Sequence, residues 1–163
     1  MRFHAEHRFN GSVAAIASLL GDPDFYVGLA LPDLSTPEVL DHRLDGNDTV
    51  VRLRYEFEGS LDPIAHRLIG AGRLAWIQEV RVDRSSGAGK LRFEAEKDPR
   101  RLHGSADFTL TPSGPGSERQ LAGELVVAIP GIGRMAERRI LPGILRRLDI
   151  EAEALNEASG SGT

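Results

Sequence analysis

The chain has 163 residues, of which 40% are hydrophobic and 27% charged, the balance of one globular domain rather than of a disordered chain. Its formal net charge is −4, and it contains no cysteine. The charge argues against bulk attraction to nucleic acid, and the lack of thiols excludes disulfides, cysteine nucleophiles and cysteine-ligated metal or iron–sulfur sites.

The first residues are charged where a targeting segment would be apolar, and no apolar run approaches the roughly 20 residues that span a bilayer. We therefore expect a cytoplasmic protein without stable membrane insertion. All basic residues except Lys90 and Lys97 are arginine, a bias that we interpret as that of a GC-rich bacterial genome.

The N-terminal part of the chain predicts one strand followed by two short helices. Residues 2–9 alternate between two faces, which is the period of a strand with one covered side. Asn10-Gly11-Ser12 then offers a helix cap before residues 13–20, and Asp22 can cap a second short helix through residue 27.

The middle of the chain predicts a series of antiparallel strands. Asp45-Gly46-Asn47-Asp48 is a strong hairpin signal, and Pro112 to Gly116 predicts a wide turn. A short helical turn is expected over residues 62–69. Period-two alternation predicts six further strands, over residues 38–44, 49–58, 73–83, 91–95, 102–110 and 121–129.

The C-terminal part predicts one long amphipathic helix over residues 132–157, since its apolar residues recur at helical spacing. Pro142-Gly143 falls inside this helix and should kink it or open a local bulge. Residues 158–163 are small and polar, so we expect a domain over residues 1–157 and a flexible tail after it.

A sheet with one apolar face and a long amphipathic helix must cover each other, which predicts an α+β fold. The order of elements, with Gly21–Tyr26 closing the first helices, resembles the START-like (SRPBCC, helix-grip) superfamily. That resemblance implies a seven-stranded curved antiparallel sheet wrapped around the C-terminal helix. Within the superfamily the chain resembles an uncharacterised bacterial domain-of-unknown-function family, on the residues Arg2–Phe9, Tyr55–Phe57, Leu102–Phe108, Ala136–Ile140 and Leu145–Leu148.

A curled sheet that holds one helix can leave a cavity between them. The residues expected to line it are Tyr55, Phe57, Trp76, Phe93, Phe108, Met135, Leu141, Ile144 and Leu145, with His7 and Gln78 as polar contacts. His7 and Gln78 each have two interpretations. They contact a polar group of a ligand, with His7 also a candidate general base, or they satisfy backbone or helix groups within the core.

Three functions stay open at this point. The preferred one is binding of a hydrophobic or amphipathic small molecule, lipid- or polyketide-like, by a carrier or sensor. The second is a polyketide cyclase or aromatase that uses His7 or Tyr55 as acid or base. The third is a cavity-poor module that binds other proteins. Leu29 and Leu31, if exposed, would form either a cavity entrance or a homodimer contact.

The remaining candidate chemistry is sparse, so we assign no catalytic residue, cofactor or metal. His4 and His7 lie on opposite faces of their strand, and the other histidines lie near no second ligand at metal spacing. Arginines on the polar side of the C-terminal helix either hold an anionic head group at the cavity mouth or form a solvated face paired with Glu137 and Asp149.

Overall fold

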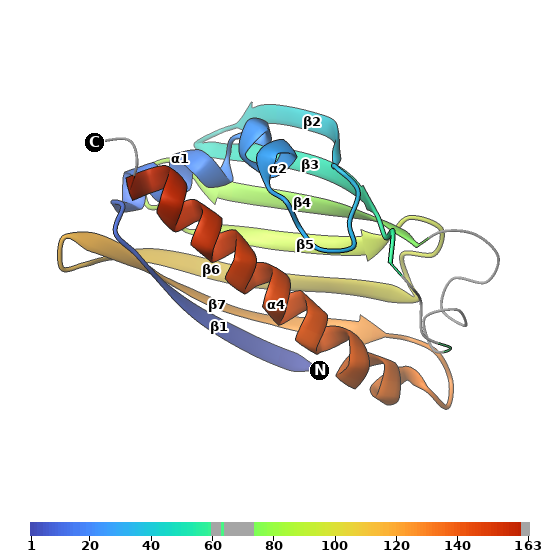
Figure 1. Ribbon diagram of the computed structural model, residues 1–163. Coiled ribbons are helices and arrows are strands. Elements are labelled where there is room, and N and C mark those ends of the chain that lie inside the picture. The colour runs from blue at the N-terminus through green and yellow to red at the C-terminus, as the bar shows by residue number, and fades with distance from the viewer. Residues whose placement is uncertain (60–62, 64–73, 161–163) are drawn as a thin grey trace.

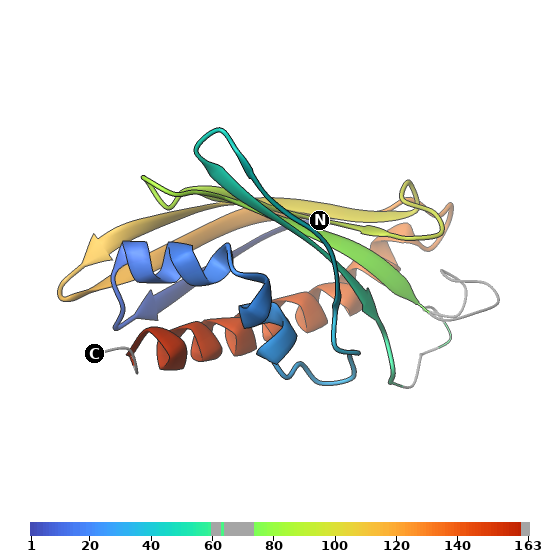
Figure 2. The ribbon, with the colours of Figure 1, turned by 90° about the horizontal axis from the view of Figure 1, so that it is seen from above.

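The computed structural model describes residues 1–59, 63 and 74–160, and these form two layers. One layer is a twisted seven-stranded sheet, and the helices of the described residues all lie on one of its faces (Figure 2). The strands are β1 (Arg2–Phe9), β2 (Glu38–Asp45), β3 (Asp48–Glu56), β4 (Ala75–Asp83), β5 (Gly89–Ala95), β6 (Leu102–Ser113) and β7 (Gly116–Val127), and the helices are α1 (Val13–Leu20), α2 (Pro23–Gly28) and α4 (Gly133–Gly160).

Every neighbouring pair of strands in the sheet is antiparallel, in the order β1-β7-β6-β5-β4-β3-β2. This confirms the expected α+β helix-grip fold, in which α4 crosses the sheet (Figure 1). The hairpin at Gly46-Asn47 is also confirmed, and the positive φ of Gly46, 61°, is the backbone conformation that such a turn requires.

The wide turn expected over Pro112 to Gly116 is wrong. Strands β6 and β7 continue until Ser113 pairs with Gly116, and only Gly114-Pro115 connects them. Gly114 has a φ of 56°, which lets the chain reverse in two residues. Strand β7 therefore begins at Gly116 and not at residue 121, and its added part buries the side chains of Ser117 and Arg119.

The two short helices form as the capping residues predict. The side-chain oxygen of Ser12 accepts a hydrogen bond from the backbone N–H of Ala15 at 3.1 Å, and Asp22 accepts one from Asp24 at 2.9 Å. The helical turn expected over residues 62–69 lies outside the described residues.

Helix α4 is continuous through Pro142 and Gly143 and ends at Gly160, three residues beyond the expected 157 (Figure 1). Its last turns are held by the connection between β1 and α1. The backbone N–H of Asn10 donates to Oδ1 of Asn156 at 2.8 Å. None of the helices in the described ranges has the length and apolar character needed to cross a bilayer.

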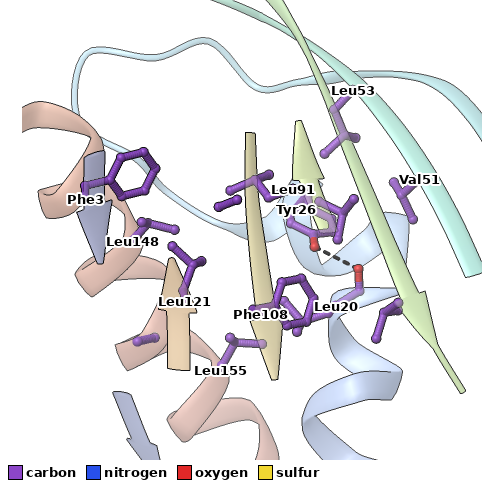
Figure 3. Packing of buried hydrophobic residues seen from close by; sticks show 14 of the residues in the cluster. Phe3, Leu20, Tyr26, Val51, Leu53, Leu91, Phe108, Leu121, Leu148 and Leu155 are labelled. Atoms are coloured by element: carbon purple, nitrogen blue, oxygen red, sulfur yellow. Dashed lines mark hydrogen bonds between the residues drawn. The ribbon is translucent and has the colours of Figure 1, made fainter. Parts of the chain in front are cut away.

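The core lies between the helices and the inner face of the sheet. Figure 3 shows Leu148 and Leu155 of α4 and Phe108 and Leu121 of the sheet directed into the same space. Tyr26 is buried there as well, and its hydroxyl donates a hydrogen bond to the backbone carbonyl of Leu20 at 2.7 Å. This bond satisfies the one polar atom that the Tyr26 ring brings into the core.

Candidate ligand-binding cavity

A cavity of about 310 Å³ lies between α4 and the half of the sheet formed by β3 to β6. Small-molecule sites occupy roughly 300–1,000 Å³, so this one is at the small end of that range. It is lined by Leu29, Leu31, Leu34, Tyr55, Phe57, Leu74, Trp76, Gln78, Leu91, Phe93, Leu102, Arg139, Ile140, Gly143, Ile144, Arg147, Leu148 and Glu151.

The sheet wall of the cavity follows from strand alternation and register. Tyr55 of β3 pairs with Trp76 of β4, and their rings stack with centroids 5.7 Å apart. Two residues further along β4, Gln78 projects on the same side and pairs with Phe93 of β5. A polar amide therefore lies among aromatic rings on this wall.

The loop between α2 and β2 supplies a second wall. Leu34 forms a backbone bridge with Phe57, and the N–H of Ser35 donates to the carbonyl of Glu56 at 2.9 Å. These bonds fix the loop against the end of β3, where Leu29 and Leu31 border the cavity.

The structure divides the expected lining residues into two groups. Tyr55, Phe57, Trp76, Gln78, Phe93 and Ile144 border the cavity, whereas His7, Phe108, Met135, Leu141 and Leu145 do not. Phe108 fills the core and is 4% exposed, while Met135 is 49% exposed in the first turn of α4. Leu141 and Leu145 follow Ile140 and Ile144 along α4 and pack against the core.

His7 joins the sheet to the helix instead of facing the cavity. Its Nε2 lies 2.9 Å from Oδ1 of Asp149 on α4, and its Nδ1 lies 3.2 Å from an Nη atom of Arg119 on β7. Of its two interpretations, this geometry matches the one in which His7 satisfies helix groups within the core.

Arg119, which is buried beside the cavity but does not line it, is a charged residue that the sequence analysis missed. Its side chain is 2% exposed, and Nη1 donates to Oε1 of Glu151 at 2.7 Å. The guanidinium also lies 5.8 Å from the centre of the Phe9 ring. The available signal was the alternation Ser117, Arg119, Leu121, which places an arginine inward and so demands a buried partner.

The sequence left two interpretations open for the arginines of α4, an anionic head group held at the cavity mouth or a solvated face paired with Glu137 and Asp149. Arg139 and Arg147 border the cavity. Glu137 is paired with the Met1 amino group at 3.5 Å and Asp149 with His7, so neither carboxylate serves as the arginines' expected counter-ion.

Burial dominates the electrostatics of the cavity. It raises the pKa of the Tyr55 phenol, and the nearby Glu151 carboxylate raises it further. The Arg147 guanidinium lies over the Trp76 ring, 5.1 Å from its centre, and burial lowers its pKa. Both side chains are therefore hydrogen-bond donors at neutral pH.

Other candidate chemistry lies outside the cavity or is not formed. Within the described ranges, no three or more histidine, aspartate or glutamate side chains gather as a metal site would require. The exposed face of β6 carries His103, Ser105 and Asp107, where water reaches all three side chains.

A long C-terminal helix laid across an antiparallel seven-stranded sheet, with a cavity between them, defines the START-like helix-grip fold. Solved structures with this fold span almost the whole chain. They include a START superfamily protein from Mycobacterium smegmatis (18% identity, TM-score 0.62, 99% of each chain covered) and the Zhui aromatase/cyclase from Streptomyces (16%, 0.63, 99% of each). A protein from Thermus thermophilus is also similar (16%, 0.64, 100% of this chain and 99% of that one).

Within this class, the chain belongs to the family described as protein of unknown function DUF2505, which it matches over residues 4–158. The START-like fold and the domain-of-unknown-function family expected from the sequence are thereby confirmed. No curated protein matches the chain. At these identities the similar structures show the fold alone, so function has to be argued from the cavity.

Proposed function

We propose that this protein binds a hydrophobic or amphipathic small molecule between the sheet and α4, as a carrier or a sensor. The cavity supports this proposal, because apolar and aromatic side chains form most of its wall and a few polar groups interrupt it. That composition is typical of small-molecule sites. Leu29 and Leu31 border the cavity, which favours an entrance there over a homodimer contact.

The two alternatives have less support. A cyclase needs an acid or base beside its substrate, but His7 is bound to Asp149 and Arg119 outside the cavity. The raised pKa of Tyr55 makes its phenol a poor base at neutral pH. A cavity-poor interaction module would have filled the space beside α4, which a volume of about 310 Å³ does not match.

The chain provides its own probe of occupancy. It contains one tryptophan, and that residue, Trp76, borders the cavity. Binding of decan-1-ol or decanoate should therefore change the intensity and wavelength of tryptophan emission in a saturable way. Extraction of the protein purified from its own host, followed by lipid and metabolite analysis, should show a bound apolar species near unit stoichiometry.

Gly143 offers a way to close the cavity without harming the fold. It borders the cavity in the interior of α4, and a Cβ placed on it meets no atom within 4 Å. Gly143→Leu should stabilise the protein by about 0.5–1 kcal/mol through helix propensity. It should also lower affinity for decan-1-ol at least about tenfold, because the cavity is already near the lower limit for a ligand site.

Gly143→Ala is the matched control, since it gains the same helix propensity and adds only a methyl group. Thermal unfolding and the Trp76 titration together separate the two effects. Unchanged affinity in the Gly143→Leu protein would place the ligand elsewhere and refute the proposal.

A further inference from the structure

Arg147 brings a positive charge into the cavity, and none of the described residues supplies a counter-ion for it. It is half-buried, and its guanidinium carbon lies over the face of the Trp76 ring, 5.1 Å from the ring centre. Within the described part of the chain, no carboxylate lies within ion-pair distance of it and no hydrogen bond from its guanidinium is formed. A desolvated charge of this kind is costly unless something compensates it.

Glu151, the carboxylate best spaced on α4 to pair with Arg147, is bound to Arg119. Glu151 follows one helical turn later, at the spacing where opposite charges pair on a helix. Its carboxylate instead accepts a hydrogen bond from the buried Arg119 at 2.7 Å. Asp33, on the loop before β2, acts on Arg147 only from beyond ion-pair distance. Burial lowers the pKa of Arg147, and Asp33 opposes that effect in part.

Two further side-chain donors, Tyr55 and Gln78, line the same cavity as Arg147. Tyr55 stacks on the ring that Arg147 covers, and Gln78 follows on the same face of β4. Among the described residues, neither side chain makes a hydrogen bond. A guanidinium, a phenol and an amide together offer many donors and only the acceptors of the phenol and amide oxygens. This part of the cavity is therefore suited to an oxygen-rich anion.

We propose that the ligand carries an oxyanion head group, a carboxylate or a phosphate monoester, which Arg147 binds with Tyr55 and Gln78 as additional donors. The apolar body of the ligand lies against Leu91 and Phe93. This assignment rests on the proposed function and names the ligand class of the same cavity. The planar guanidinium can bind two oxygens of either head group at once.

The test compares ligands that share one chain and differ in the head group. Decanoate, decyl phosphate and decan-1-ol are titrated by calorimetry into the wild-type protein and into Arg147→Met. The wild-type protein should bind at least one of the anions about tenfold or more tightly than the alcohol, as a charged hydrogen bond predicts. Arg147→Met should bind all three alike. Arg146→Met is the matched control and should behave as wild type, because Arg146 is the exposed neighbour of Arg147 and lies outside the cavity.

The outcomes separate this inference from the proposed function. If all three ligands bind equally to the wild-type protein, the anionic head group is refuted and the apolar cavity stands. If none binds, the proposed function itself fails. A preference for anions that survives in Arg147→Met, or that Arg146→Met also loses, refutes the assignment to Arg147. If Arg147→Met does not fold, Arg147→Gln, which is neutral and hydrophilic, replaces it in the same titrations.

Discussion

Replacement of Arg119 by methionine tests how strongly the buried ion pair holds α4 to the sheet. The substitution keeps the apolar stem and removes the charge, which leaves the Glu151 carboxylate, itself 14% exposed, without its partner 2.7 Å away. Removal of one member of a buried pair costs about 3–5 kcal/mol, against a total stability of about 5–15 kcal/mol for a typical protein. For a chain of this size we expect a fall in Tm of roughly 6–20 °C.

The assay is a double-mutant cycle, measured by urea unfolding. Arg119→Met, Glu151→Gln and the double variant are compared, and the double variant should lose less stability than the sum of the two single losses. Arg52→Met is the control, because Arg52 and Glu79 form a pair on the outer face of the sheet at 3.7 Å. An exposed pair contributes about 0–1 kcal/mol. If Arg119→Met costs no more than Arg52→Met, the argument for a structural buried pair is refuted.

Three further variants probe single contacts. Tyr26→Phe removes the hydrogen bond to Leu20 and should cost about 0.5–1.5 kcal/mol in urea unfolding, while a neutral result would contradict its role. Gly104→Ala would place a Cβ 2.2 Å from the Phe93 ring, so it should lower Tm and alter the Trp76 titration; unchanged values would count against this packing. Backbone hydrogen bonds hold the pKa of Asp83 below its ordinary 3.8. Its contribution is therefore complete above that value and lost as pH falls through the lower, folded-state pKa. Asp83→Asn should be less stable than wild type at pH 7, and this difference should shrink as the pH falls below 3.8.

The fold was accessible from the sequence because alternation and helical spacing are local signals. The alternation of residues 2–9 in the sequence predicts the two faces, one covered and one exposed, that β1 has in the sheet. The start of β7 was missed because proline and glycine over residues 112–116 are equally compatible with a wide loop and a two-residue turn. That error hid Arg119, whose inward position follows only once the strand is extended backwards.

The candidate site was less accessible because it depends on where α4 lies over the sheet. Helical spacing places Leu141 and Ile144 on the same apolar side, yet only Ile144 borders the cavity. Helical spacing determines which residues share a face of the helix, but it does not determine which strand that face packs against. The prediction for Phe108 failed for the same reason, because an inward side chain on a strand fills the core or lines a cavity according to what lies opposite it.

The two edges of α4 are attached to the sheet by different kinds of contact. Polar contacts join it to β1 and the residues that flank it: Met1 to Glu137, His7 to Asp149 and Asn10 to Asn156. The opposite edge presents Ile140, Ile144 and Leu148 to the cavity, and Arg139 and Arg147 lie beside them. Directional bonds resist sliding, whereas apolar contacts separate and re-form without a fixed geometry. A ligand larger than the cavity would thus be accommodated by a swing of α4 about its β1 edge, with that edge acting as the hinge and the aromatic wall of β3 and β4 remaining in place.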